Sequence, residues 1–366
     1  MTDEKTYDRT FDQTGVAPQP PTKLPDEPYY REPTATQRTN RTRLGALLLV
    51  IGVVWLAVEL LGRGVLFGGA LGPTTVLDRS APGASRIELD ALSADVEVRT
   101  DDGPIRVEAV QRGGRSGDYT VGFEQSGDTV RVTTGSNGGF CLFCGRDLSY
   151  TVSVPADSQV TIRTTSGDIT ISGLEGGEAA LPDLTTVSGS IEARELSGGL
   201  KASTTSGDLD LRDVAGRLEV QTSSGEVSLQ DGALSGAQVR TTSGDIDLRG
   251  ALGRLELNST SGEISVRDVR DGVLNISASS GDISYQGSLA VGSHQVSTVS
   301  GGVDLRLPED SSLRLHATTV SGELSMEGFE GQRIEETRRE LNGNVGDGAA
   351  DVSVVTTSGD VEVRGE

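Results

Sequence analysis

A Ser-Gly dipeptide set in the same apolar frame recurs ten times between residues 166 and 359 of this chain. Successive copies are 18 to 22 residues apart, except for a last interval of 37 residues. Apolar residues stand four positions before each serine and two positions after each glycine. This alternation on both sides of a turn predicts two short strands per repeat, and the period predicts that the repeats stack as coils. The ten glycines are Gly167, Gly189, Gly207, Gly225, Gly244, Gly262, Gly281, Gly301, Gly322 and Gly359.

Composition agrees with a stack of coils rather than a globule. Aromatic residues make up only 4% of the chain, whereas 49 residues are glycine. A solenoid needs only a thin stack of Ile, Leu and Val as its core. The sequence therefore predicts an all-β fold, a parallel β-solenoid (β-helix) of two-strand coils with an N-terminal β cap. Glycine at the corner supplies either a positive φ or room for a neighbouring backbone.

The region before the repeats predicts a membrane anchor. Residues 44–61 form an apolar stretch broken only by Glu59, long enough for one transmembrane α-helix. Arg38, Arg41 and Arg43 precede it and only Arg63 directly follows, so the N-terminus is expected in the cytoplasm and the repeats outside. A cleaved signal peptide is the alternative. The expected localisation is the cell membrane, single-pass, with an extracytoplasmic repeat domain.

The predicted domains follow from these patterns. They are a disordered cytoplasmic tail (1–43), the transmembrane helix (44–62), a linker (63–83), a β cap region (84–154) and the solenoid (155–366). Within the cap, Ser126-Gly127 is interpreted as a hairpin turn. In the 37-residue interval we expect a coil that has lost its Ser-Gly, with a helix over residues 331–341. The last strand, Val361–Arg364, is expected to be an open edge available for self-association.

Charge limits the partners. The formal net charge is −22, which disfavours nucleic acid and anionic lipid or polymer as direct ligands. An acid follows the corner glycine in eight of ten copies, and an arginine often stands five residues after that glycine. We interpret these rows as a charge-balanced surface. The alternative is that the carboxylates of Asp208, Asp245 and Asp282 collect Ca²⁺, although the glycine-rich nonapeptide that typically binds calcium is absent.

The two cysteines, Cys141 and Cys144, form a single C-x-x-C motif. A local disulfide in an oxidising compartment is the main interpretation. A redox site would need a strand-to-helix context, and zinc would need two further ligands, for which only the distant His294 and His316 exist. Both histidines are expected at the surface. Since no set of catalytic side chains stands out, the sequence predicts no enzyme activity and no cofactor.

The repeat resembles a known family. The unit T-T-S-G-D-I, the segment VPADSQVTIRTTSGDI at Val154–Ile169 and its echo LPEDSSLRLHATTVSGEL at Leu307–Leu324 are similar to the bacterial putative-adhesin β-strand-repeat domains of unknown function. The resemblance covers about residues 84–366 and implies a parallel β-solenoid displayed on the cell envelope. The apolar segment is also weakly similar to the LiaF-like transmembrane region of envelope-stress regulators.

Two functions fit these observations. The first is an anchored, non-enzymatic adhesion or scaffold module that binds an envelope polymer or protein, or its own copies. The second is an envelope-stress sensor or regulator that signals through a membrane or cytoplasmic partner.

Overall fold

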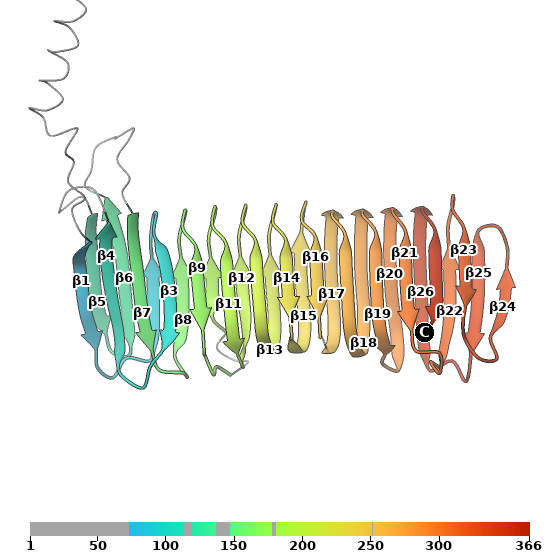
Figure 1. Cartoon of the computed structure of the whole chain (residues 1–366), viewed down its shortest axis with the longest axis horizontal. Helices are drawn as coiled ribbons and strands as arrows, with labels where there is room; N and C mark the ends of the chain where they lie inside the picture. The colour runs from blue at the N-terminus through green and yellow to red at the C-terminus, as the bar shows by residue number, and fades with distance from the viewer. Residues whose placement is uncertain (1–72, 113–118, 137–146, 178–180, 251) are drawn as a thin grey trace, which may run out of the picture. The chain divides into compact units, whose positions relative to one another are not determined.

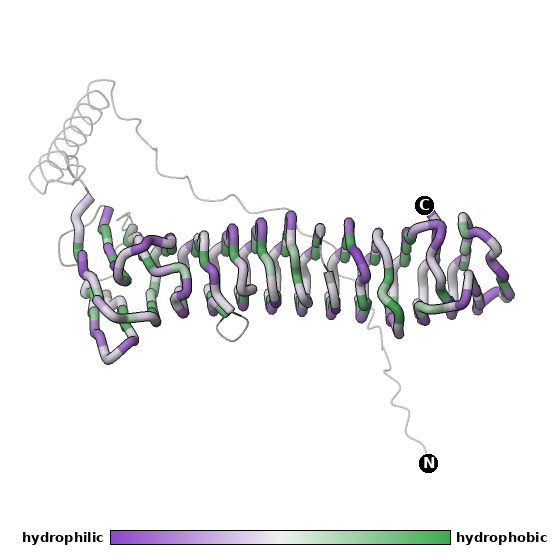
Figure 2. Tube along the Cα trace, turned by 90° about the horizontal axis from the view of Figure 1, so that it is seen from below, coloured by the Kyte–Doolittle hydropathy of each residue, from purple (hydrophilic) through white to green (hydrophobic). Residues whose placement is uncertain are grey.

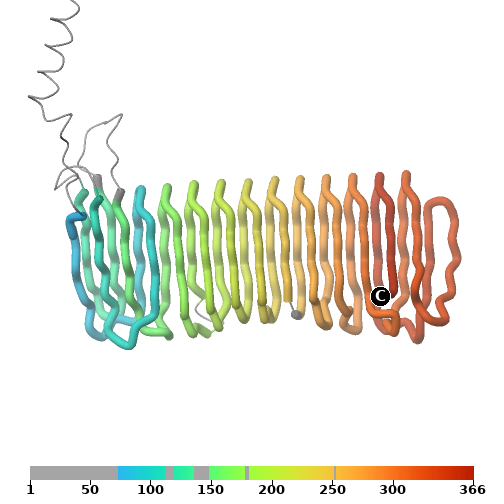
Figure 3. The backbone as a smooth tube through the Cα atoms, in the orientation of Figure 1, coloured from blue at the N-terminus to red at the C-terminus, as the bar shows by residue number. Residues whose placement is uncertain are grey.

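The computed structural model describes residues 73–112, 119–136, 147–177, 181–250 and 252–366, and within them it is built of β-strands. Figures 1 and 3 show these strands stacked side by side in an elongated row. This confirms the prediction of an all-β parallel solenoid for the described part of the chain. No helix among the described residues has the length and apolarity to cross a membrane. The predicted tail, the apolar segment 44–62 and the Cys141–Cys144 motif lie outside the described residues.

Two sheets face each other, and each coil, or layer, contributes one strand to each. Sheet A contains β1 Thr74–Ala81, β3 Asp95–Thr100, β4 Ile105–Arg112, β7 Asp147–Val154, β9 Ile169–Ser172, β11 Ile191–Leu196, β14 Val227–Gln230, β16 Ile246–Arg249, β19 Ile283–Leu289, β21 Val303–Leu307, β23 Leu324–Glu327 and β27 Val361–Gly365. Sheet B contains β2 Arg86–Asp90, β5 Tyr119–Ser126, β6 Thr129–Ser136, β8 Gln159–Arg163, β10 Asp183–Thr185, β12 Gly199–Ser203, β15 Ala233–Thr241, β17 Leu252–Ser261, β20 Gly292–Ser300, β22 Leu313–Thr318, β24 Arg333–Glu336, β25 Glu340–Val345 and β26 Ala350–Ser358. Two long strands, β13 Leu209–Gln221 and β18 Ile264–Ser280, bend from sheet A into sheet B.

The core is a thin stack of identical positions between the sheets. In sheet A, Leu209 pairs with Val227, Val227 with Ile246 and Ile246 with Ile264, all in parallel register. Each of these side chains is buried. Figure 2 shows the resulting alternation of hydrophobic and hydrophilic positions along the coils. Apolar side chains therefore stack on like side chains from layer to layer, which is why the sequence repeats.

The Ser-Gly corner is fixed by contact between neighbouring layers. A Cβ placed on Gly207 would lie 1.9 Å from the carbonyl oxygen of Gly189, and one on Gly244 would lie 2.0 Å from that of Gly225. Neither glycine has a positive φ, so the corner requires glycine for space and not for conformation. The buried threonine three residues before the glycine adds a bond, as when Thr204 Oγ1 donates to the Gly189 carbonyl at 3.3 Å.

The second corner of each coil, from sheet A back to sheet B, obeys a different rule. The residue four positions after the first apolar residue of the sheet A strand takes a positive φ in successive layers. Only some layers place glycine there. The residues at this position are Gly173, Glu195 (φ 54°), Asp213 (φ 52°), Asp231 (φ 55°), Gly250, Asp268 (φ 57°) and Gly287.

The layers do not follow chain order at the two ends. At one end, β2 pairs with both β6 and β8, and β3 with both β7 and β9, so the first coil is an internal layer. Outside it, β5 is antiparallel to β6, β4 is antiparallel to β7, and β1 is antiparallel to β4. The β5–β6 hairpin turns at Gly127 (φ 61°), as predicted for Ser126-Gly127.

At the other end, the last coil of the chain is also internal. Strand β26 pairs with β20 and β22, and β27 pairs with β21 and β23. The expected open edge at Val361–Arg364 is therefore wrong, because both sides of β27 are already paired. The prediction failed because layer order is a non-local property, whereas the sequence pattern is local.

The predicted helix over 331–341 is wrong as well. Strands β24 and β25 form an antiparallel hairpin there, and β25 is antiparallel to β22 at the end of sheet B. Leu341 and Val345 are buried, whereas Ile334 is the only apolar side chain on β24. Gly343, between Leu341 and Val345, is also buried, so burial alternates along β25, which fits a strand and provides no helical apolar stripe. The 37-residue interval thus holds a terminal hairpin and not a coil that has lost its corner.

Candidate functional site

The strongest candidate is a shallow notch of about 280 Å³ on the outer face of sheet B, at the middle of the stack. The notch arises from an irregularity in strand register. Gly216 pairs with Leu234 while Arg217 pairs with Gly236, so Ser235 is an extra residue that bulges from β15. Bulges of this kind often re-aim side chains next to functional sites. The lining residues are Arg217, Leu218, Ser235, Gly236, Ala237, Gln238, Arg254 and Glu256.

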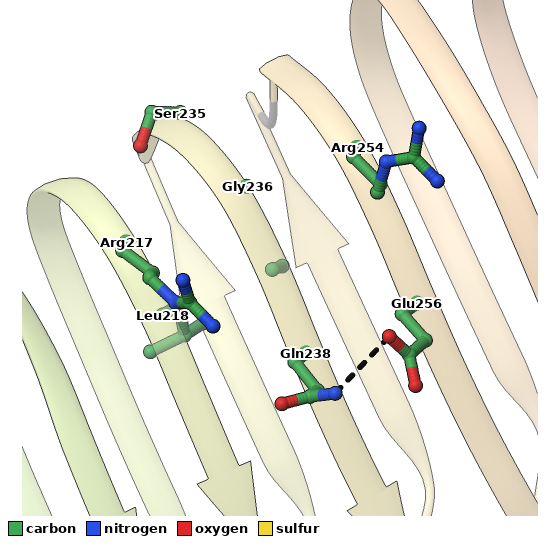
Figure 4. A pocket seen from close by; sticks show the side chains of 8 residues that line it. Arg217, Leu218, Ser235, Gly236, Gln238, Arg254 and Glu256 are labelled. Carbon is green, nitrogen blue, oxygen red and sulfur yellow. Dashed lines mark hydrogen bonds between the residues drawn. The ribbon is translucent and has the colours of Figure 1, made fainter.

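Two arginines flank a glycine in this notch. Arg217 pairs with Gly236 on the next strand, and Gly236 pairs with Arg254 on the strand after it. Figure 4 shows the two arginine side chains on either side of Gly236. Since neighbouring strands are about 4.8 Å apart, the arginine backbones are about 10 Å apart. The missing side chain at Gly236 leaves the space between them open.

The acidic groups around the notch are held by other partners. The Glu256 carboxylate accepts hydrogen bonds from Gln238 Nε2 at 3.0 Å and Arg240 Nη2 at 2.5 Å. Arg217 Nη2 lies 2.8 Å from Glu219 Oε1. Among the described residues, Arg254 forms no ion pair, and its side chain is exposed. The notch therefore offers one uncompensated guanidinium and a second that is only partly neutralised.

The outer face of sheet A is different because its arginines pair within their own strands. Arg212 Nη2 lies 2.7 Å from Asp210 Oδ2, and Arg306 Nη2 lies 2.9 Å from Asp304 Oδ2. Hydrogen bonding to the Asp304 carboxylate raises the pKa of Arg306. Most arginines of this row are thus compensated by an acid two residues earlier in the same strand, whereas Arg267 pairs with Asp247 of the neighbouring strand at 3.8 Å. The sequence indicated that the acids of the Ser-Gly corner compensate these arginines, but in the structure the acids within sheet A do so.

The acids proposed as calcium ligands have a structural role. The Oδ1 atoms of Asp208, Asp245 and Asp282 each accept the backbone N–H of the next layer, at 3.0, 2.8 and 2.7 Å. The three residues are not neighbours, because Glu226 and Glu263 occupy the layers between them. Within the described part of the chain, no group of three or more His, Cys, Asp or Glu residues is arranged to hold a metal ion.

The two histidines occupy different environments. His294 is buried, with Nδ1 accepting the Leu274 N–H at 3.3 Å and Nε2 facing the Ala290 carbonyl at 2.9 Å. Burial lowers its pKa. The expectation that His294 is a surface residue is therefore wrong. His316 is exposed, and its Nδ1 lies 2.8 Å from Asn342 Oδ1.

Sequence reasoning missed the notch for a simple reason. Gly216-Arg217 and Gly253-Arg254 fit a glycine-containing corner between two strands, and Gly236 carries no sequence signal of its own. The available signal was a break in the row, since Gly236 stands where the neighbouring strands carry arginine. Cys141 and Cys144, the predicted disulfide, lie outside the described residues.

Solved structures and one protein family are similar to this chain. Solved structures similar to this chain include a putative lipid binding protein of Parabacteroides distasonis (16% identity, TM-score 0.40, covering 81% of this chain and 98% of that one). They also include a putative adhesin of Bacteroides fragilis (14%, 0.33, 80% and 97%) and a putative cell adhesion protein of Clostridium sporogenes (9%, 0.22, 81% and 100%). No curated protein matches the chain. Residues 84–364 match the Toastrack DUF4097 family, and the chain belongs to that family.

Proposed function

We propose that this protein is a membrane-anchored, extracytoplasmic and non-enzymatic adhesion or scaffold module that binds a polymer of the cell envelope. The observation that carries the proposal is the exposed arginine notch on sheet B, set in a flat face of polar side chains. A second hollow on the same face, lined partly by Lys201, Gln221 and Gln238, lies next to it. Planar amide and guanidinium groups repeated at strand spacing suit a linear ligand that lies across several strands.

The charges narrow the polymer class. A guanidinium binds a carboxylate through two parallel hydrogen bonds, so one carboxylate of the polymer would lie between Arg217 and Arg254. The net charge of −22 would repel a densely charged polyanion. The proposed ligand is therefore an otherwise neutral glycan or peptidoglycan-type polymer that carries isolated carboxylates. Attachment to the membrane through residues 44–62 would hold the module at the polymer surface.

A co-sedimentation experiment tests the proposal. The full-length protein in detergent is mixed with insoluble envelope polymer from the source cells, in the presence of Ca²⁺ and in the presence of a chelator. We expect saturable binding in both conditions that falls about tenfold in affinity for Arg217→Ala/Arg254→Ala. Blocking the carboxylates of the polymer as amides is expected to have the same effect as the double substitution.

The matched control is Arg212→Ala/Arg249→Ala on the outer face of sheet A, which removes the same number of positive charges. This variant is expected to bind like the unaltered protein. Equal losses in both double variants would mean that only net charge matters, which contradicts a site at the notch. Failure to bind any polymer fraction, with a regulator co-purifying on the tail 1–43, would instead favour the envelope-stress function.

A further inference from the structure

Two segments with a shared Pro-x-Asp-Ser sequence connect sheet A to sheet B at the ends of the stack. Val154-Pro155-Ala156-Asp157-Ser158 joins β7 to β8, and Leu307-Pro308-Glu309-Asp310-Ser311 joins β21 to β22. Both form the same turn. The Ser158 N–H donates to the Pro155 carbonyl at 3.1 Å, and the Ser311 N–H donates to the Pro308 carbonyl at 2.9 Å.

Each of these turns passes over a layer that another part of the chain fills. In the middle of the stack, a sheet A strand leads to the sheet B strand of the next layer, as from β11 to β12. After β7, however, the chain crosses the layer of β2 and β3 before it enters β8. After β21 it crosses the layer of β26 and β27 before it enters β22. The Pro-x-Asp-Ser turn thus marks a skipped layer, about 10 Å wide between the strands on either side.

The two skipped layers are filled in opposite order. The layer of β2 and β3 precedes its turn in the chain, so it is present when the turn forms. The layer of β26 and β27 follows its turn, so β20–β23 present two facing rows of unpaired backbone groups until residues 350–365 arrive. Unpaired strand edges of this kind accept an added strand.

The gap between the β20–β21 layer and the β22–β23 layer, called the slot below, is specific for the coil formed by β26 and β27. Thr356 Oγ1 donates to the Gly301 carbonyl, and Thr319 Oγ1 donates to the Gly359 carbonyl, each at 3.3 Å. A Cβ on Gly359 would lie 1.9 Å from the Gly301 carbonyl oxygen, which reproduces the corner contact of the internal layers. The side chains of Val352, Val354, Val361 and Val363 are buried in the stack. The coil therefore completes the same backbone and core contacts as any internal layer.

Within the part of the chain that the structure describes, this coil is connected to the other layers on one side only, through the segment before β26. This tether is the loop over residues 346–349. The Gly292 N–H donates to the Ala349 carbonyl at 3.3 Å, and the Ser312 hydroxyl makes the other contacts. Ser312 Oγ accepts the backbone N–H groups of Asp347, Gly348 and Ala349 at 3.2, 3.0 and 3.2 Å. Ser312 belongs to the segment that crosses the slot, so its hydroxyl connects this crossing segment to the tether through hydrogen bonds.

From this geometry we infer that the slot between the β20–β21 and β22–β23 layers is a strand-acceptor site. Its resident ligand is the C-terminal coil, residues 350–365, and the same coil of a second copy of this chain can replace it. A coil with one tether can enter from the side without threading, which internal coils with two connections cannot do. Exchange would join copies by donated coils rather than by an open edge.

Cysteine pairs placed across the slot test this inference in the full chain with Cys141→Ser and Cys144→Ser. Ser297 and Val355 are direct partners on β20 and β26. One copy carries Ser297→Cys and a differently tagged copy carries Val355→Cys. After mixed refolding and oxidation, we expect a disulfide-linked heterodimer. Adding Ser312→Ala to both copies is expected to raise its yield about five- to tenfold, since the tether loses its hydrogen-bond acceptor.

Two controls make the outcome decisive. Copies with Ser277→Cys and Ser297→Cys, which are partners on the internal strands β18 and β20, should give no heterodimer above background. A single chain with Ser297→Cys and Val355→Cys should form the cross-link within itself. If that chain cross-links but the mixed copies never do, even with Ser312→Ala, exchange is refuted. If that chain does not cross-link, the assigned slot is wrong.

Discussion

The two corners of each coil meet the same task, reversing the chain between the sheets, under different constraints. At the Ser-Gly corner, the backbone of one layer lies against the backbone of the next, and no room remains for a Cβ. At the second corner, one position takes a positive φ, and Gly, Asp and Glu all occupy it in this chain. Contact with the neighbouring layer also occurs there, but only in some layers, as at Gly253 and Gly287. A constraint between layers therefore fixes the residue, whereas a constraint within one layer fixes only the conformation.

This difference explains where the molecule departs from its repeat. Both Pro-x-Asp-Ser turns lie on the second-corner side, and so does the bulge at Ser235 that opens the notch. The Ser-Gly side instead keeps its spacing through the stack, because an added residue there would disturb two neighbouring layers at once. We expect ligand contacts and insertions on the permissive side, and changes in stability from substitutions on the other.

The largest effect is expected from Gly244→Ala at the Ser-Gly corner. Its Cβ would lie 2.0 Å from the Gly225 carbonyl oxygen, so the two layers must separate locally. We expect a loss of about 3 kcal/mol in the free energy of unfolding, measured by urea denaturation with circular dichroism. Gly177→Ala is the control, since nothing lies within 4 Å of a Cβ at that position and its φ is not positive. Equal stability of the two variants would contradict the tight corner.

A second prediction concerns pH and the second-corner loop that His294 supports. The neutral ring bonds the Leu274 N–H and the Ala290 carbonyl, and burial lowers its pKa below the usual 6.5. Below pH 6.5 the unfolded chain binds a proton that the folded chain does not. Stability attributable to His294 should therefore fall as pH decreases from 6.5 to the folded pKa, by at most about 1.4 kcal/mol per pH unit.

Unfolding of the unaltered protein and of His294→Gln, measured between pH 7 and pH 5, isolates this contribution from that of the many carboxylates. The substituted protein should lose less stability over this range. The exposed His316→Gln controls for removing an imidazole. A pH dependence unchanged by His294→Gln would mean that the buried ring does not resist protonation.

The coil itself could be predicted from sequence because the residues that produce it recur from one repeat to the next. The alternation of apolar and polar residues around Gly207 and Gly225 indicates which side chains are buried. The glycines themselves indicate close contact between layers. Layer order could not be predicted, because the turns that begin at Pro155 and Pro308 do not reveal in their sequence which distant strands fill the layer that they cross. The notch was equally inaccessible, since it depends on the one-residue shift of register at Ser235. His294 was misplaced because it was judged by its polar residue type, whereas its position on β20, two residues before the buried Val296, turns it inward.

A smaller effect is expected within the row of threonines beside the Ser-Gly corner. Thr204 and Thr222 are equally buried, but Thr204 Oγ1 donates to the Gly189 carbonyl, whereas Thr222 Oγ1 finds no hydrogen-bond partner among the described residues. Thr204→Val should cost about 1 kcal/mol. Thr222→Val should be neutral or stabilising, because it removes a buried unpaired hydroxyl. Urea midpoints of the two variants, compared at equal slope, provide the measurement, and equal losses would show that the bond contributes nothing.

The smallest effect is expected at the second corner, and its sign is opposite. Glu195 has a φ of 54°, a conformation that costs a side-chain-bearing residue about 1 kcal/mol. Glycine removes that cost but adds freedom to the unfolded chain, so Glu195→Gly should stabilise by about 0.5 kcal/mol. Glu226→Gly, at an exposed Ser-Gly corner position without a positive φ, should instead destabilise by a similar amount. Thermal unfolding of both variants compares the corners directly, because the same substitution should raise the midpoint at one and lower it at the other. If both changes lowered the midpoint, the second corner would have to be constrained by its neighbouring layers as well as by its own backbone.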